Sequence, residues 1–344
     1  MDILSEVLRA QHLHGTVYFR ADFREPWGLD IQGGEFANFH IVAAGQCWLR
    51  HGPAGTQTCT LLEMGDVVVF PHGSPHALLH APDATPVPAR RLLGQPADKE
   101  HPEATPEFGG GGAVTTRLVC GHFAYDRQCP HPLFETLPPI VHVRGSASAG
   151  ARWLATAGEL AAAESSANRP GAAAVVDRLA EALLIQSLLG FVAQLDPMES
   201  RSFLAAIQDR SIGRALNLMH TVITRDWTLE ELSREAGVSR SVFTERFKVL
   251  VGTSPMLYLA RWRMLKARGL LRESSLSVAQ IADLVGYQSE FSLSKAFKRL
   301  FGMAPGAFRN SPWLDPKPGT AARLRPPAAG ASSSARRPAR RTAG

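Results

Sequence analysis

The chain has 344 residues, which is enough for about two domains of ordinary size. Its content of 45% hydrophobic and 20% charged residues is typical of a globular protein and excludes a wholly disordered or fibrous chain. No apolar run reaches the roughly 18 residues of a membrane span, and residues 1–10 lack the charged and apolar regions of a secretion signal. These features predict a cytoplasmic protein without membrane contact.

The net charge of +6 is unevenly distributed along the chain. Residues 214–310 contain 15 Lys/Arg against 8 Asp/Glu, whereas residues 1–213 contain 15 Lys/Arg against 22 Asp/Glu. The tail, residues 313–344, is basic and rich in Pro, Ala and Ser, and we expect it to be disordered. A basic C-terminal half on an acidic N-terminal half indicates a polyanionic ligand for the C-terminal half.

Residues 1–148 are expected to form a β-rich domain. Short apolar runs between Gly, Pro and Asp turns indicate strands. A long loop, rich in Pro, Ala and Gly, is expected at 81–113. The predicted strands are 17–19, 39–43, 47–49, 67–70, 114–123 and 140–143.

Residues 149–204 are expected to be a helical linker or dimerisation region, with helices at 149–163 and 172–195. In the second helix, Val176, Leu179 and Leu183 follow the 3- and 4-residue steps of one helix face, and Ile185 and Leu189 continue a neighbouring face. Two interpretations remain open for this helix: it belongs entirely to the core, or one side packs on the core and the other in a homodimer.

Residues 205–312 are expected to be all helical and contain a repeat of about 50 residues. Four apolar or turn positions recur 50 residues apart, and three earlier positions recur 49 apart, so one residue is inserted in the second turn. The matched pairs are Thr228/Ser277, Leu232/Ile281, Gly237/Gly286, Phe243/Leu293, Phe247/Phe297, Gly252/Gly302 and Pro255/Pro305.

Each copy of the repeat is typical of helix, turn, helix. The first helix begins with a capping box, in which a hydroxyl and a carboxyl or amide side chain bond the free backbone N–H groups. The boxes are Thr228-Leu-Glu-Glu231 and Ser277-Val-Ala-Gln280. Gly237 and Gly286 then permit the tight turn that other residues resist.

The second helix of each copy is expected at 240–250 and 290–300, after a capping serine. A connecting helix is expected from Pro255 to about Leu271, and it would span about 26 Å. A stiff connector of this length could set the two reading helices into successive major grooves, which lie about 34 Å apart on one side of DNA. Side chains on the exposed faces of the second helices can then reach bases and phosphates. These side chains are Arg240, Ser241, Thr244, Glu245 and Lys248 in the first copy, and Glu290, Phe291, Ser294, Lys295, Lys298 and Arg299 in the second.

Three segments of the C-terminal region resemble the AraC/XylS family of bacterial transcription regulators, over about 100 residues in all. They are 227–248, 278–298 and the ending Phe301-Gly-Met-Ala-Pro-Gly-Ala-Phe-Arg309. The resemblance implies a seven-helix DNA-binding domain, a homodimer, an unknown small-molecule effector and contact with RNA polymerase, as expected of an activator. Glu245 departs from the pattern, because relatives often have a long polar or basic residue there. It would accept from cytosine or weaken binding at the first site. The base-contacting positions implied here are Ser241, Thr244, Glu245, Glu290, Phe291, Ser294 and Lys295, and the phosphate-contacting positions are Arg240, Lys248, Ser289, Lys298 and Arg299.

The N-terminal half resembles a cupin-type sensor domain. Residues 65–76, Gly-Asp-Val-Val-Val-Phe-Pro-His-Gly-Ser-Pro-His, fit the second cupin motif, and His40 falls where the first motif has a metal ligand. Val42 replaces the second histidine of that motif, and no acidic ligand follows. The fold class expected is therefore multidomain, with a cupin-like β-barrel plus helices followed by the all-α tandem helix-turn-helix domain. The effector pocket is expected at His40, His76 and Trp48.

Metal binding is the open alternative inside the barrel. His40 and His76, joined by His72, His80 or Cys47, would suit zinc or another transition metal. The favoured interpretation is that they are hydrogen-bonded lining residues, so no cofactor is predicted.

The cysteines form no C-x-x-C pair, so reduced thiols are expected. Two Cys-x-His pairs raise the alternative of a zinc or redox site. The resemblance implies instead that Cys120-Gly and His131-Pro-Leu are structural features of this kind of sensor domain. The pairs are Cys120-Gly-His122 and Cys129-Pro-His131; Cys47 and Cys59 complete the set.

Three functions compete at this point. A sequence-specific DNA-binding regulator without enzymatic activity explains the repeat, the charge asymmetry and the two-domain layout. A metal-dependent cupin enzyme with an appended DNA-binding domain would need three converging ligands, and the sequence clearly offers two. A nonspecific chromosome-binding protein would bind DNA with a steep salt dependence and no sequence preference.

Overall fold

The computed structural model describes residues 2–11, 14–53, 55–89, 107–125, 131–145, 149–166, 170–194 and 202–311. The predicted tail at 313–344, residues 90–106 of the predicted loop, and Cys129 lie outside them. The N-terminal elements are α1 (Ile3–Ala10), β1 (His14–Arg24), β2 (Gly28–Ile31), β3 (Ala37–His51), β4 (Thr58–Glu63), β5 (Val67–Phe70), β6 (His76–Leu79), β7 (Val87–Pro88), β8 (Glu107–Gly109), β9 (Val114–Ala124), α3 (Pro132–Glu135), β10 (Val141–Val143), α4 (Ala149–Ser166) and α5 (Ala172–Gln194).

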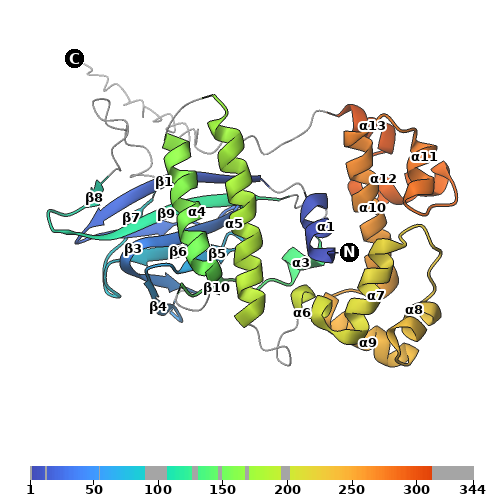
Figure 1. Ribbon diagram of the computed structural model, residues 1–344, viewed down its shortest axis with the longest axis horizontal. Helices are drawn as coiled ribbons and strands as arrows, with labels where there is room; N and C mark the ends of the chain where they lie inside the picture. The colour runs from blue at the N-terminus through green and yellow to red at the C-terminus, as the bar shows by residue number, and fades with distance from the viewer. Residues whose placement is uncertain are drawn as a thin grey trace, which may run out of the picture. The chain divides into compact units, whose positions relative to one another are not determined.

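The strands form a curled, cupin-like half-barrel (Figure 1), as the sequence predicts. The main path of the sheet runs β7-β2-β6-β3-β9-β1-β8, with β4 and β5 pairing with β3 and β10 pairing with β5. The long strand β3 belongs to both parts of the curled sheet, because its first part pairs with β5 and β9 and its last part pairs with β4 and β6.

A register shift in β3 between Val42 and Ala44 allows this strand to serve both parts of the sheet. Gly45, just after the shift, has φ +72, and a Cβ there would lie 1.8 Å from the carbonyl oxygen of Thr115. Only glycine fits so close an approach of two strands. The two separate runs predicted at 39–43 and 47–49 are therefore one bent strand.

The concave side of the sheet is filled by apolar side chains that alternate along each strand. They form one buried cluster inside the half-barrel. Its members are Ala21, Phe23, Trp27, Leu29, Val42, Cys47, Leu49, Leu62, Val68, Phe70, Leu78, Leu118 and Cys120.

The helices α4 and α5 pack against each other and cross the outer face of the sheet, over β1, β3 and β9 (Figure 1). The buried face of α5 includes Val176, Leu183 and Leu188, which join the core with Phe39 and Ile41 of β3. On the opposite side, Val175 and Leu189 of α5 are 45% and 44% exposed. The helix predicted at 172–195 is therefore core on one side only.

Residues 202–311 are helical throughout, apart from turns. The elements are α6 (Phe203–Gln208), α7 (Arg210–Thr221), α8 (Leu229–Ala236), α9 (Arg240–Val251), α10 (Pro255–Glu273), α11 (Val278–Leu284), α12 (Glu290–Phe301) and α13 (Pro305–Asn310). The predicted helix-turn-helix units are confirmed as α8–α9 and α11–α12. Both capping boxes form, with Thr228 and Ser277 accepting from the N–H groups of Glu231 and Gln280.

One face of α10 is buried. Its sequence pattern predicts an apolar stripe of Met256, Leu259, Trp262 and Leu265, and the last three are buried, but Met256 is 39% exposed. Tyr258, which the sequence pattern does not single out, is 1% exposed and takes the place next to Leu259 in the core.

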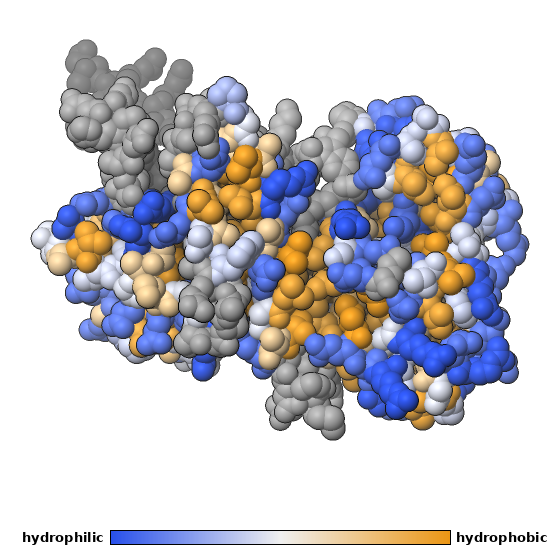
Figure 2. Space-filling model, in the orientation of Figure 1, coloured by the Kyte–Doolittle hydropathy of each residue, from blue (hydrophilic) through white to orange (hydrophobic). Residues whose placement is uncertain are grey.

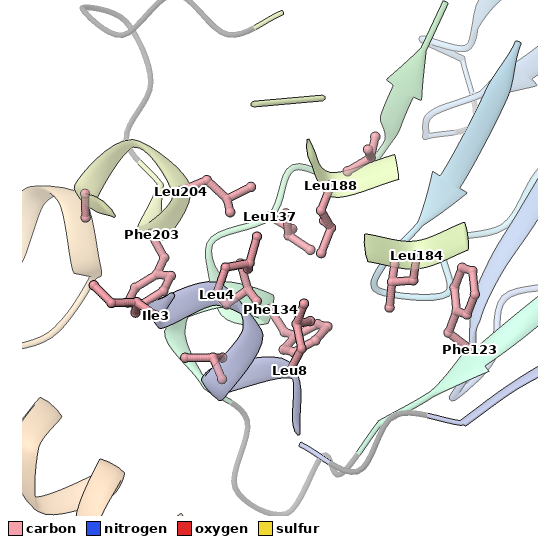
Figure 3. Close-up of a cluster of buried hydrophobic side chains, with 14 of the residues drawn as sticks. Ile3, Leu4, Leu8, Phe123, Phe134, Leu137, Leu184, Leu188, Phe203 and Leu204 are labelled. Atoms are coloured by element: carbon pink, nitrogen blue, oxygen red, sulfur yellow. The ribbon is translucent and has the colours of Figure 1, made fainter. Parts of the chain in front are cut away.

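The main core is continuous from the outer face of the sheet to the first helix-turn-helix unit. Figure 3 shows part of it, where Ile3, Leu4 and Leu8 of α1 gather with Phe134 and Leu137 and with Phe203 and Leu204, which begin α6. A separate buried cluster supports the second unit. Its members are Met264, Ala267, Leu271, Ile281, Ala282, Val285, Leu293, Phe297 and Phe308.

Candidate DNA interface and sensor cavity

The helices α9 and α12 each bury an apolar face and leave the opposite face open. Phe243 and Phe247 of α9 and Leu293 and Phe297 of α12 are all fully buried. Because the two residues of each pair are one turn apart, they mark one side of their helix, and the opposite side faces outward. Ser239 and Ser289 cap the two helices, accepting from the N–H groups of the third residue along.

The residues predicted to contact DNA lie on the open faces of α9 and α12. Thr244 and Ser294 are half-buried, and the other predicted positions are exposed. Thr244 turns its hydroxyl back to the carbonyl oxygen of Arg240, at 2.8 Å. Phe291 is 78% exposed at the start of α12. The geometry therefore presents these side chains to a ligand.

The connecting helix α10 has 19 residues and so spans about 28 Å. Arg263 fixes it to the turn before the first unit, donating to the carbonyl oxygens of Ile223 and Arg225 at 3.0 and 2.7 Å. Near its end, Arg272 donates to the carbonyl oxygen of Ser311 at 2.8 Å. Both helix-turn-helix units are thus anchored to one rigid element.

A buried chain of hydrogen bonds joins α10 to the N-terminal part of the molecule. The N–H of Leu133 donates to Nδ1 of His131 at 3.0 Å, so neutral His131 carries its proton on Nε2. That Nε2 lies 3.1 Å from the hydroxyl of Tyr258, which lies 2.6 Å from Nε2 of His220. Nδ1 of His220 lies 3.2 Å from the carboxylate of Glu6.

When both imidazoles are neutral, all three hydrogen bonds of this series are donated in one direction, from His131 toward Glu6. His131 donates to Tyr258, Tyr258 donates to His220, and His220 donates to Glu6. Burial lowers the pKa of both histidines, that of His131 well below 6.5, which favours the neutral forms. The hydrogen bond from His220 lowers the pKa of Glu6, which keeps the final acceptor ionised.

Inside the half-barrel, the predicted pair His40 and His76 lie together. Their Nε2 atoms are 2.7 Å apart, and Nδ1 of His40 lies 3.0 Å from Sγ of Cys120. His76 also contacts the carbonyl oxygen of Ser74 through Nδ1, at 2.8 Å. Burial lowers the pKa of His40 well below 6.5 and that of His76 to about 4. Both imidazoles are therefore neutral, hydrogen-bonded side chains.

The third predicted pocket residue, Trp48, does not join this pair. Cys47 and Leu49 point into the half-barrel, so strand alternation places Trp48 on the opposite face, where it is half-buried. His72 and His80 are also directed elsewhere, toward the carbonyl oxygens of Leu137 and Trp27.

Metal ligation would need a different arrangement of the His40 ring. Cys120 and His76 contact opposite nitrogens of His40, so the three side chains do not converge on one point. Across the part of the chain that the structure describes, no group of three or more His, Cys, Asp or Glu side chains could hold a metal ion.

The predicted second Cys/His cluster is dispersed as far as it is described. Cys120 contacts His40, and His131 belongs to the series of hydrogen bonds that ends at Glu6. The ring centroids of His122 and Phe36 lie 4.4 Å apart. The fourth member, Cys129, lies outside the described residues. Cys47, Cys59 and Cys120 are free thiols.

A cavity of about 700 Å³ opens at one end of the half-barrel. Phe70 forms part of its wall, and the Phe70 ring stacks on His76, with ring centroids 3.6 Å apart. The His40–His76 pair thus lies behind one wall of the cavity rather than in its lining. The lining residues are His51, Gly52, Pro53, Thr56, Thr58, Phe70, Ser74, Pro75, Pro138, Pro139 and Ile140.

Sequence reasoning missed both the cavity and the buried chain from His131 to Glu6. The cavity walls come from three separate turns, and only the strand registers bring these together. His220 and Tyr258 lie in amphipathic helices where a buried polar residue gives no local signal. For His131 the sequence suggests a metal or redox ligand or a structural mark of the sensor, but not a hydrogen bond to α10.

Comparison with known proteins agrees with both halves of this architecture. Residues 2–191 match the family model described as Cupin, and this range covers α4 and all but the end of α5. Residues 232–311 match the family model described as Helix-turn-helix domain. A cupin-type half-barrel followed by tandem helix-turn-helix units defines a transcription regulator that binds double-stranded DNA.

The chain is 30% identical to a putative AraC-like transcription regulator of Streptomyces lividans, over 84% of this chain and 91% of that protein. It is 28% identical to the HTH-type transcriptional regulator AlkR of Acinetobacter baylyi, over 90% of this chain and 99% of AlkR. The chain belongs to the AraC-like family of transcription regulators. A solved structure, the DNA-binding domain of AdpA in complex with a target DNA, is 31% identical over 29% of this chain and 90% of its own, with a TM-score of 0.28.

Proposed function

We propose that this regulator recognises its DNA sites with the N-terminal halves of α9 and α12, inserted in successive major grooves. The observation that carries the proposal is the pair of matched, outward faces held on one rigid helix, α10. The exposed ring of Phe291 suits the methyl group of thymine, and Lys295, one turn further, suits guanine. The base-contacting set proposed is Ser241, Thr244, Glu245, Glu290, Phe291, Ser294 and Lys295.

The remaining exposed groups on the two helices are proposed to hold phosphates. Lys298 and Arg299 lie in the last turn of α12, away from its N-terminal half, and Lys248 occupies the equivalent position in α9. Arg240 and Ser289 lie at the helix starts, where backbone N–H groups also favour an anion. Such contacts position the protein without reading sequence.

The full-length chain is tested by selection from a random pool of duplex DNA at two salt concentrations. Enrichment of one sequence, bound at least a hundredfold more tightly than scrambled DNA, is the expected result. Equal binding to every duplex, with only a salt effect, would favour the nonspecific chromosome-binding alternative.

We further propose a homodimer formed through the outer faces of α4 and α5. Trp153 and Leu160 of α4 are 43% and 57% exposed, and Val175 and Leu189 of α5 are similarly open. Figure 2 shows apolar side chains among polar ones on the face over these helices. Leu160→Glu is expected to convert dimer to monomer in sedimentation velocity, whereas Met64→Glu, at an exposed turn of the sheet, should not.

We propose that the N-terminal domain senses a small-molecule effector. The whole protein would then act at the nucleoid as an activator, through contact with RNA polymerase. The support is the half-barrel with a cavity of ligand size and the family to which the chain belongs. Among the described residues, no helix is long and apolar enough to cross a membrane.

A further inference from the structure

The cavity at the end of the half-barrel has walls from three parts of the chain. The turn between β3 and β4, with the strand ends beside it, contributes His51, Gly52, Pro53, Thr56 and Thr58. The end of β5 and the turn that follows it contribute Phe70, Ser74 and Pro75. The third wall is Pro138, Pro139 and Ile140, which follow α3. A volume of about 700 Å³ is within the usual range for a small-molecule site.

The lining of this cavity is largely apolar and carries no Asp, Glu, Lys or Arg. Four prolines, Ile140 and Phe70 supply rigid apolar surface. Its polar groups are neutral: Nε2 of His51 lies 3.0 Å from the hydroxyl of Thr58, and Thr56 and Ser74 add two more hydroxyls. A charged ligand would lose its hydration here without an opposite charge in the lining.

We propose that this cavity binds an uncharged, largely apolar small molecule, and that the segment from His131 to Ile140 transmits its presence to α10. The proposal rests on the sensor function proposed above and names its site, its ligand class and its route.

The segment His131–Ile140 is the only stretch of the described chain that both lines the cavity and bonds to α10. One end, Pro138–Ile140, is a cavity wall. Leu137, next to it, accepts a hydrogen bond from His72 and is buried against α1 and α6 (Figure 3). A displacement of the wall toward Leu137 would therefore meet close-packed side chains, which pass it along the segment.

The other end of the segment meets the DNA-reading helices. His131 donates to Tyr258 of α10, and the Glu135 carboxylate lies 3.6 Å from the guanidinium of Arg261 on the same helix. The hydroxyl of Thr136 accepts from the N–H of Phe203, at the start of α6. The methyl group of Thr136 also lies beside Gly252, which ends α9. The same segment thus contacts the first recognition helix and the connector of both units.

Binding is tested with the uncharged fluorescent probe N-phenyl-1-naphthylamine and full-length protein, without DNA. We expect a blue-shifted rise in probe fluorescence that saturates. Thr56→Trp or Pro53→Trp, each placing a large ring in the cavity from an exposed position, should weaken probe binding at least tenfold. Thr85→Trp is the matched control, because Thr85 lines a different cavity of about 490 Å³.

The ligand class is tested by competition against the bound probe. Decanol should displace the probe, and decanoate at pH 7.5 should compete at least tenfold less well. No probe binding, loss of binding only in Thr85→Trp, or equal competition by decanoate would overturn the proposal. None of these outcomes depends on DNA recognition, so failure of the regulator function would be seen separately in DNA selection.

Transmission is tested by hydrogen exchange with and without the probe. We expect slowed or accelerated exchange in the peptides that cover 131–140 and 255–262. In Tyr258→Phe, the change at 131–140 should remain and the change at 255–262 should fall by at least half. A response confined to 131–140 in the wild-type protein would overturn the proposed route.

Discussion

Nε2 of His131 lies 3.1 Å from the hydroxyl of Tyr258, although 127 positions separate the two residues in the chain. His131 caps α3 in the N-terminal half, and Tyr258 lies in the helix that connects the two DNA-reading units. Both side chains are 1% exposed. The sensor and DNA-binding regions are therefore joined by a buried polar contact, whose geometry is far more exacting than that of apolar packing.

Removing the Tyr258 hydroxyl should destabilise this junction. In Tyr258→Phe, Nε2 of His131 loses its acceptor and Nε2 of His220 loses its donor, and both remain buried. Each unsatisfied group costs about 1–3 kcal/mol, so we expect a fall of about 2–5 kcal/mol in the free energy of unfolding, measured by urea denaturation. Tyr287→Phe, in the half-buried turn of the second unit, is the control. A loss in Tyr258→Phe no larger than in Tyr287→Phe would show that the chain of hydrogen bonds is not formed.

Stability should decrease as the pH falls below about 6.5. Burial lowers the pKa of His131 and His40 well below 6.5, and those of His76 and His122 to about 4. In this window the unfolded chain binds more protons than the folded one, so the stability present above pH 6.5 is lost progressively toward pH 4. For His76 alone the loss is on the order of 3 kcal/mol, from a pKa change of 6.5 to about 4.

Urea denaturation at pH 8, 7, 6.5 and 5 measures this effect. The free energy of unfolding should be nearly constant between pH 8 and pH 7 and lower at pH 5. A constant or rising value from pH 6.5 to 5 would mean that these histidines are solvated or already protonated in the native protein.

Two glycines at the same position of the repeat should respond differently to the same substitution. Gly237 and Gly286 have φ of +72 and +76, so alanine is strained at both by about 1–2 kcal/mol. A Cβ at Gly237 would meet nothing within 4 Å, whereas one at Gly286 would lie 2.8 Å from the carbonyl oxygen of Ile223. Gly286→Ala should therefore lower the melting temperature clearly more than Gly237→Ala. Equal shifts would contradict the close approach of α11–α12 to the turn at 222–225.

Two lysines on α12 should differ in what they contribute to DNA binding. Lys298→Ala should weaken binding to all duplexes alike and reduce the slope of log K against log salt by about 1. Lys295→Ala should in addition relax the base preference at one position, at about 1–3 kcal/mol of discrimination. Fluorescence anisotropy with the selected site and with single-base variants measures both effects. Arg178→Ala, on the exposed face of α5, is the control. A uniform loss on every sequence for both lysines would remove the distinction between their roles.

The helix-turn-helix units were predictable because their signals are local. Capping boxes, turn glycines and paired aromatic anchors lie within a few residues of each other and occur twice in register. α1 was missed although Asp2 caps it and Ile3, Leu4, Val7 and Leu8 have helical spacing. Its apolar face packs on residues more than 100 positions away, so its role in the core is not visible in its own segment.

The sensor half was harder to predict because its features depend on strand register. The bend at Gly45 decides which residues of β3 face inward. Because the sequence does not reveal this bend, Trp48 was expected in the effector pocket, whereas it lies on the opposite face of the strand from Cys47 and Leu49. His40 and His76 were correctly brought together by the cupin-like motif, since they lie 2.7 Å apart. The cavity near them is formed by residues of separate turns that share no motif.

The central claim is that α9 and α12, held at a fixed distance by α10, read two elements of one DNA site. The most direct test measures the affinity of the full-length chain for the selected site with 5 or 10 base pairs inserted between its two elements. Because α10 cannot lengthen, both insertions should weaken binding at least tenfold, whereas the same insertions outside the elements should have no effect. Unchanged affinity after either internal insertion would contradict the claim.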